Sequence, residues 1–211
     1  MIRMVFSPPL STDTINGLVA LLERHCDTYP ALSEELRRHR TLSRILAQHE
    51  DLAARALSAW RAAISERWER EVQAQRVYRL AQQQLGAYYG ADPAYTQLIA
   101  PAHPGGAITP GELLHELRRI EASLELLLPR PPFAAALLAE LQAAREALTR
   151  AMERTEACEA ERRNVLAEQR IAVNLYERAY DRSRRLIVRY LGEQAPALPV
   201  TCTVEPMAAG S

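Results

Sequence analysis

Residues 31–85 read ALSEELRRHRTLSRILAQHEDLAARALSAWRAAISERWEREVQAQRVYRLAQQQL, a stretch that contains neither glycine nor proline. From Leu32 to Tyr88, apolar residues fall on alternating three- and four-residue steps, which is the spacing of one apolar stripe on a helix. Polar residues interrupt the stripe at five of its positions: His39, Ser43, Glu50, Arg67 and Glu71. A second set of apolar residues makes this face wider than a two-stranded coiled coil needs. It consists of Leu42, Ile45, Leu52, Ala56, Ala59 and Ala63. The sequence therefore predicts a helix of the bundle type over about Leu32–Tyr89.

A second stretch without glycine or proline, Phe133–Leu191, predicts a second long helix. A shorter helical pattern precedes each of them. The first ends near Thr28 before Pro30, because a residue before proline disfavours the helical conformation. The second runs from Thr109 to about Leu128 and is ended by residues 129–132, PRPP. Gly90 and Gly192 follow the two long helices, as residues that close a helix in the left-handed conformation often do.

The two halves of the chain also match one another at an offset of 102 residues. The residues that end or begin helices coincide without a gap, and these matches are Pro8 with Pro110, Pro30 with Pro132, Gly90 with Gly192 and Pro104 with Pro206. Within the helices, Tyr78 matches Tyr180 and Tyr88 matches Tyr190. Glycine and proline fix element boundaries, so their coincidence indicates an internal duplication.

These patterns predict an all-α, elongated antiparallel helical bundle or coiled coil from two similar halves, each a short helix followed by a very long one. The first repeat with its proline-rich linker spans residues 1–108, and the second with an extended tail spans residues 109–211, most simply as one intertwined domain. The alternative is a turn near residues 49–51 that would give compact three-helix bundles. We favour continuous helices, because the matching residues 151–153 carry no helix-breaking signal.

Composition narrows the classes of function. The 211 residues contain 26 basic and 26 acidic residues, and every basic residue is arginine. A net charge of zero gives no overall attraction to nucleic acid or to anionic membranes. The three cysteines, Cys26, Cys158 and Cys202, lack the spacing of zinc or redox sites, and residues 1–10 do not resemble a signal peptide. We therefore expect a soluble, cytoplasmic protein with no membrane partner.

Three groups of side chains have the spacing of functional sites. Glu112 and His115 have the Glu-x-x-His spacing of di-iron bundles, but no second copy exists, and Thr109 with Glu112 forms a helix capping box. Glu35 and His39, four residues apart, are expected to be an ordinary surface pair. Glu66 and Glu168 match across the repeat; we expect each to pair with arginine rather than to share a cation. We predict no metal and no cofactor.

Tyrosines near the carboxyl ends of the long helices are the strongest candidates for binding a small molecule, because aromatic rings with polar tips are typical of pockets. The candidate residues are Tyr78, Tyr88, Tyr180 and Tyr190, with Tyr89 and Tyr176 nearby. The simpler interpretation is that they form the half-buried rim of a helix bundle.

The sequence contains no recognisable catalytic set, so we expect a non-enzymatic scaffold or adaptor that acts through a protein partner or through self-association as a homodimer. Two alternatives stay open. One is a helical bundle that holds a metal or small ligand. The other is a nucleic-acid binder that uses an arginine stripe, which we do not favour because the helix dipole alone accounts for those cations. The stripe consists of Arg178, Arg182, Arg185 and Arg189.

Overall fold

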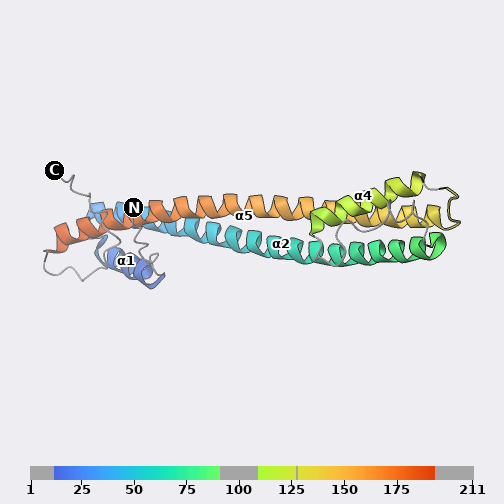
Figure 1. Cartoon of the computed structure of the whole chain (residues 1–211). Helices are drawn as coiled ribbons and strands as arrows, with labels where there is room; N and C mark the ends of the chain where they lie inside the picture. The colour runs from blue at the N-terminus through green and yellow to red at the C-terminus, as the bar shows by residue number, and fades with distance from the viewer. Residues whose placement is uncertain (1–11, 91–108, 127, 193–211) are drawn as a thin grey trace, which may run out of the picture. The chain divides into compact units, whose positions relative to one another are not determined.

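The described part of the chain is entirely helical. A computed structural model describes residues 12–90, 109–126 and 128–192. They form α1 (Thr12–His25), α2 (Pro30–Tyr89), α4 (Pro110–Leu126) and α5 (Ala134–Leu191), and the two long helices pack antiparallel (Figure 1). The predicted all-α order of short, long, short and long helices is confirmed. The linker 91–108, the tail 193–211 and Cys202 lie outside the described residues.

Both long helices are continuous, which decides between the two architectures that the sequence allowed. α2 contains 60 residues and passes through residues 49–51 without a turn. Gly90 and Gly192 have φ angles of 63° and 53°, as predicted for residues that close a helix. The short helices end slightly earlier than predicted, at His25 and Leu126.

The start of α4 has the predicted capping box. The backbone N–H of Thr109 donates to Glu112 Oε2 at 2.7 Å, and the N–H of Glu112 donates to Thr109 Oγ1 at 3.3 Å. These two bonds satisfy backbone groups that the first helical turn leaves unpaired. Glu112 is thereby engaged as a cap.

The chain forms two compact units, which we call unit 1 and unit 2. Unit 1 comprises residues up to Arg55 and from Arg163 onward, and unit 2 comprises Ala56–Arg162. Unit 1 thus contains α1, the first part of α2 and the last part of α5. Unit 2 contains the rest of α2, α4 and the first part of α5. Each unit combines a short helix with segments of both long helices.

The hydrophobic cores of the two units use equivalent residues. The unit 1 core includes Leu18, Leu22, Tyr180 and Ile187, and an offset of 102 residues converts these into Ile120, Leu124, Tyr78 and Leu85 of the unit 2 core. The two similar halves are therefore visible in the packing as well as in the helix order. Each half of the chain supplies residues to both units. The division of the chain into domains 1–108 and 109–211 stays a prediction.

Candidate functional site

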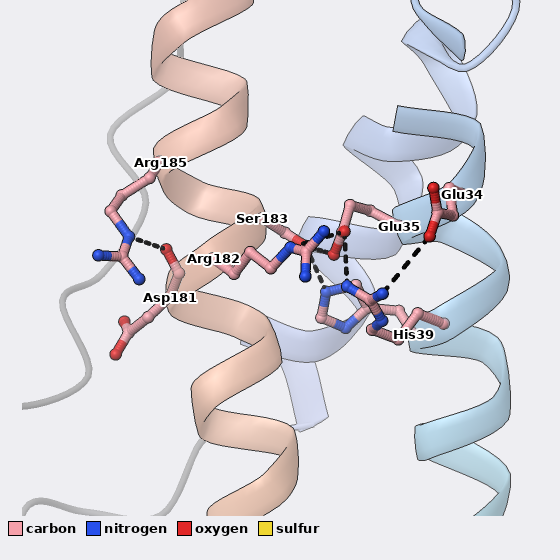
Figure 2. A network of polar contacts seen from close by, with 8 residues as sticks. Glu34, Glu35, His39, Asp181, Arg182, Ser183 and Arg185 are labelled. Carbon is pink, nitrogen blue, oxygen red and sulfur yellow. Dashed lines mark hydrogen bonds and ion pairs between the residues drawn. The ribbon is translucent and has the colours of Figure 1, made fainter. Parts of the chain in front are cut away.

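Unit 1 contains a buried polar cluster between α2 and α5 (Figure 2). Glu35 and His39 come from α2, and Ser183 comes from α5; their exposed fractions are 1%, 0% and 0%. The Ser183 hydroxyl donates to Glu35 Oε2 at 2.9 Å and lies 2.8 Å from His39 Nε2. We call these three residues the buried triad. The expectation that Glu35 and His39 form a surface pair is wrong, because α5 and α1 cover this part of α2.

Two arginines compensate the buried charge of Glu35. Arg38 Nη1 donates to Glu35 Oε1 at 2.7 Å, and Arg182 Nε lies 3.1 Å from the same oxygen. Arg182 belongs to the predicted arginine stripe on α5. At least one member of that stripe therefore has a structural role, which is to neutralise a carboxylate that burial would otherwise destabilise.

The buried triad joins α2 to α5 through side-chain hydrogen bonds. The single hydroxyl proton of Ser183 is donated to Glu35, so the contact with His39 requires that Nε2 carries the proton and donates it. In a nucleophile–base pair the histidine accepts the serine proton instead. His39 Nδ1 is then an acceptor, and it has no hydrogen-bond partner among the described residues.

Burial lowers the pKa of the His39 imidazole from its ordinary value of 6.5. The nearby Glu35 carboxylate and the main chain of Ala179 oppose this shift, while Arg38 adds to it. Tyr176 lies edge-on to the imidazole, with ring centroids 5.2 Å apart. His39 is therefore expected to be neutral in the folded protein near pH 7.

Acidification is expected to destabilise the fold through His39. Because its pKa is lowered on folding, the unfolded chain binds the extra proton below about pH 6.5, and stability falls by up to about 1.4 kcal/mol per pH unit. Urea unfolding between pH 8 and pH 5 measures this effect, with His39→Leu as the comparison. The wild-type protein should lose more stability than the variant below pH 6.5. Equal pH dependence in both would contradict the prediction.

Unit 2 has apolar residues at the positions of the buried triad. Leu137, Leu141 and Ala81 are equivalent to Glu35, His39 and Ser183, and all three are buried. Unit 2 has a buried polar contact between α2 and α4 instead. Tyr78 donates to Glu116 Oε2 at 3.0 Å, and Arg119 Nη2 pairs with the same oxygen at 2.6 Å.

The Tyr78–Glu116 contact perturbs both groups. Burial, followed by the hydrogen bond to Glu116, raises the pKa of Tyr78 to about 12. Burial alone would raise the pKa of the Glu116 carboxyl, but the hydrogen bonds from Arg119 and Tyr78 outweigh it and lower that pKa. Tyr78 is therefore a neutral donor to an ionised carboxylate near neutral pH.

The four predicted ligand-binding tyrosines are divided between the units. Tyr78 belongs to the unit 2 core and Tyr180 to the unit 1 core. Tyr88 is exposed in unit 2, where it packs edge-on against Phe133 with centroids 5.8 Å apart. Tyr190 is exposed in unit 1 and stacks on Tyr29 at 5.0 Å. Within each unit, one predicted tyrosine supports the core and the other covers a helix end. Ligand binding by them stays a prediction.

The two carboxylates that match across the repeat differ in their contacts. Glu168 is exposed and has no ion-pair partner among the described residues, so the expectation that it pairs with arginine is wrong. Glu66 pairs with Arg154 at 2.8 Å, as expected for a salt-bridged carboxylate, although the partner is not one of its sequence neighbours. Within residues 12–90, 109–126 and 128–192, no three His, Cys, Asp or Glu side chains gather as a metal site requires. In the same residues, no helix has an apolar run long enough to span a membrane.

Four exposed apolar residues in unit 1 form the feature that the sequence did not single out as a site. Ile45 and Leu52 of α2 are 37% and 41% exposed, and Ile171 and Leu175 of α5 are 60% and 51% exposed. Seven residues separate the first two and four residues separate the others, so each pair lies on one face of its helix. We call these four residues the apolar face.

The two pairs lie on the same side of the α2–α5 pair. Arg38 is seven residues before Ile45, so these two residues lie on one face of α2. Arg182 is seven residues after Leu175, so these two residues lie on one face of α5. Both arginines contact the same atom, Glu35 Oε1. The surfaces from which they extend must therefore adjoin.

α1 covers the other side of these helices. Figure 2 shows Arg182 and Glu34 in front of the pair, with α1 behind it. Arg40 of α2 forms an ion pair with Glu23 of α1 at 2.7 Å, which places α1 on the side of α2 that carries Arg40. No described helix of unit 1 therefore covers the apolar face.

The equivalent surface of unit 2 is not apolar. An offset of 102 residues places Ala147, Arg154, Glu69 and Gln73 at the positions of Ile45, Leu52, Ile171 and Leu175. The units share their core pattern and differ on this surface. The difference was present in the sequence, because aligning the halves sets three large apolar residues against charged or amide side chains.

Comparisons with protein-family models, with curated proteins and with solved structures found no match for this chain.

Proposed function

We propose that the protein is a non-enzymatic helical scaffold that acts through protein–protein contact, and that the apolar face of unit 1 is the contact surface. The observation that carries the proposal is the exposure of four large apolar side chains on one side of α2 and α5. Clustered apolar exposure on a helical surface is typical of interaction sites, whereas single exposed leucines are common.

The magnitude of burial supports the proposal. Fully burying a Leu or Ile side chain stabilises by about 1.5–3 kcal/mol, and roughly half of each of these side chains is exposed. A partner that covers the face would therefore gain on the order of 1 kcal/mol per residue, before the costs of association. The total gain over the four side chains is of the size expected for a protein–protein contact of moderate affinity that forms reversibly.

The polar clusters support a structural protein rather than an enzyme. In the buried triad, Ser183 donates to Glu35, whose carboxylate is also held by Arg38 and Arg182, and all three triad residues are buried away from any substrate in solution. In unit 2, Glu116 is held by Tyr78 and Arg119. Both clusters join a long helix to another helix and leave the outer surfaces for contacts.

Site-specific photocrosslinking tests the proposal. A benzoylphenylalanine residue at position 175 of the full chain is expected to give discrete covalent adducts when irradiated in the cells that produce the protein. The matched control places the same group at position 73, the equivalent site in unit 2. Mass spectrometry then identifies the second component of each adduct. Absence of discrete adducts from position 175, with the protein folded and abundant, would contradict the proposed contact surface.

A further inference from the structure

We infer that the apolar face is occupied by a second copy of this chain, packed about a two-fold axis so that α2 and α5 of two unit 1 segments form a four-helix section. The inference rests on the proposed function, since it names the partner of the same surface. It follows from the pattern of residues on the exposed stripe of α5.

The exposed stripe of α5 is apolar at its centre and oppositely charged at its ends. Glu168 is seven residues before Leu175, and Arg178 is seven residues after Ile171, so both lie on the same stripe as the apolar pair. All four side chains are exposed. Neither Glu168 nor Arg178 has an ion-pair partner within the part of the chain that the structure describes.

This stripe is complementary to a reversed copy of itself. Ile171 and Leu175 are placed symmetrically about Val173, and so are Glu168 and Arg178. If α5 packs antiparallel to the α5 of a second copy with Val173 at the axis, Ile171 meets the partner's Leu175. In the same arrangement Glu168 meets the partner's Arg178, twice by symmetry. An interface between identical copies requires this kind of self-complementarity.

The same axis also suits α2. Within unit 1, His39 is opposite Ser183 and Tyr29 is opposite Tyr190, so the two helices run past one another in a known register. That register places Val173 beside about Ala47, which lies between Ile45 and Leu52. One axis therefore brings all four residues of the apolar face to the centre of the interface. Two antiparallel helix pairs joined by apolar residues make a four-helix bundle.

The equivalent stripe of unit 2 lacks this pattern. Its residues are Glu66, Glu69, Gln73 and Arg76, which place two carboxylates and an amide where α5 has a carboxylate and two apolar side chains. Glu66 is already paired with Arg154. The contact between copies is therefore assigned to unit 1 alone.

Sedimentation equilibrium of the full chain over about 1–200 μM tests the inference, and circular dichroism checks that each variant keeps its helices. Leu175→Glu is expected to raise the dimer dissociation constant by at least about tenfold, because it places a carboxylate at the apolar centre. Gln73→Glu, the matched change in unit 2, should leave that constant unchanged.

A charge swap tests the proposed register. Glu168→Arg alone and Arg178→Glu alone should each weaken the dimer severalfold, because each sets like charges opposite one another. The double variant Glu168→Arg with Arg178→Glu should return to within about threefold of wild type, because opposite charges face each other again.

The outcomes separate this inference from the proposed function. A wild-type chain that stays monomeric throughout the range, a dimer insensitive to Leu175→Glu, or a double charge swap without recovery would each overturn the two-fold contact. If the adducts formed at position 175 contain a different protein and no second copy, the dimer is wrong and the scaffold stands. If position 175 forms no adduct and the chain is monomeric, both are wrong.

Discussion

Replacing Glu35, His39 and Ser183 together by Leu, Leu and Ala is expected to leave the helices intact and to raise the free energy of unfolding by about 1–4 kcal/mol. These are the residues that unit 2 has at the equivalent positions, Leu137, Leu141 and Ala81. Burying Glu35 removes a carboxylate from water, and its ion pairs repay that cost incompletely. Leucine has no such cost, and leucine is buried at both equivalent positions of unit 2.

The two arginines that pair with Glu35 do not oppose this result. The side chains of Arg38 and Arg182 are 33% and 55% exposed, so water can solvate both guanidinium groups after the carboxylate is removed. Their long apolar stems can continue to cover the helix surface. The triple replacement therefore leaves no buried charge without a partner.

Urea unfolding followed by circular dichroism measures the effect, with Ser183→Ala as the single-site comparison. That variant removes the hydroxyl between Glu35 and His39 and leaves both polar groups buried. It is expected to lower the free energy of unfolding by about 1–3 kcal/mol. A triple variant less stable than wild type would show that the buried triad is a net stabilising element.

The reverse change in unit 2 has the largest expected cost. Leu137→Glu places a carboxylate at the position equivalent to Glu35, and it should lower the free energy of unfolding by about 3–5 kcal/mol at pH 7. The arginines that neutralise Glu35 have no counterpart there. Glu140 stands at the position of Arg38, and Leu80 stands at the position of Arg182. The new carboxylate therefore meets a like charge and an apolar side chain.

The pH dependence of this variant identifies the cause. Burial raises the pKa of a carboxyl group, so the folded variant binds a proton that the unfolded chain releases as the pH rises. The stability lost by Leu137→Glu should shrink as the pH is lowered from 7 to 4, by up to about 1.4 kcal/mol per unit. Leu137→Gln, a neutral control, should be less destabilised and should show no such recovery. Adding Glu140→Arg to Leu137→Glu should restore part of the loss at pH 7.

The helix boundaries were predictable because they depend on local chemistry. Proline removes a backbone donor and glycine tolerates positive φ, so Gly90, Gly192 and the capping box at Thr109 indicate helix ends without reference to tertiary structure. The short helices end earlier than predicted because their last turns contain no such residue. After α1, the N–H groups of Thr28 and Tyr29 share the carbonyl of His25 in a turn instead of continuing the helix.

The candidate site was less predictable, because helical spacing shows which residues share a face but not which element covers that face. His39 lies on the predicted stripe, yet only contact with α1 and α5 decides that it and Glu35 are buried. For the apolar face the sequence pattern predicts burial, and the structure shows exposure. The sequence pattern predicts that Ile45 and Leu52 widen the core surface, but α1 lies on the other side of the helix pair and leaves both residues exposed. The offset comparison of the two halves was the signal that distinguished them.

The chain segments that make up each unit determine the order in which the units can fold during synthesis on the ribosome. Unit 2 is one continuous segment, whereas unit 1 joins the beginning of the chain to its end, across bonds that span 144 and 148 residues. Chains emerge amino-terminus first, at about 5–20 residues per second. Unit 2 can therefore assemble while translation continues, and α1 must wait for the last segment of α5. The core around α1 is therefore completed after the core of unit 2, although α1 precedes unit 2 in the chain.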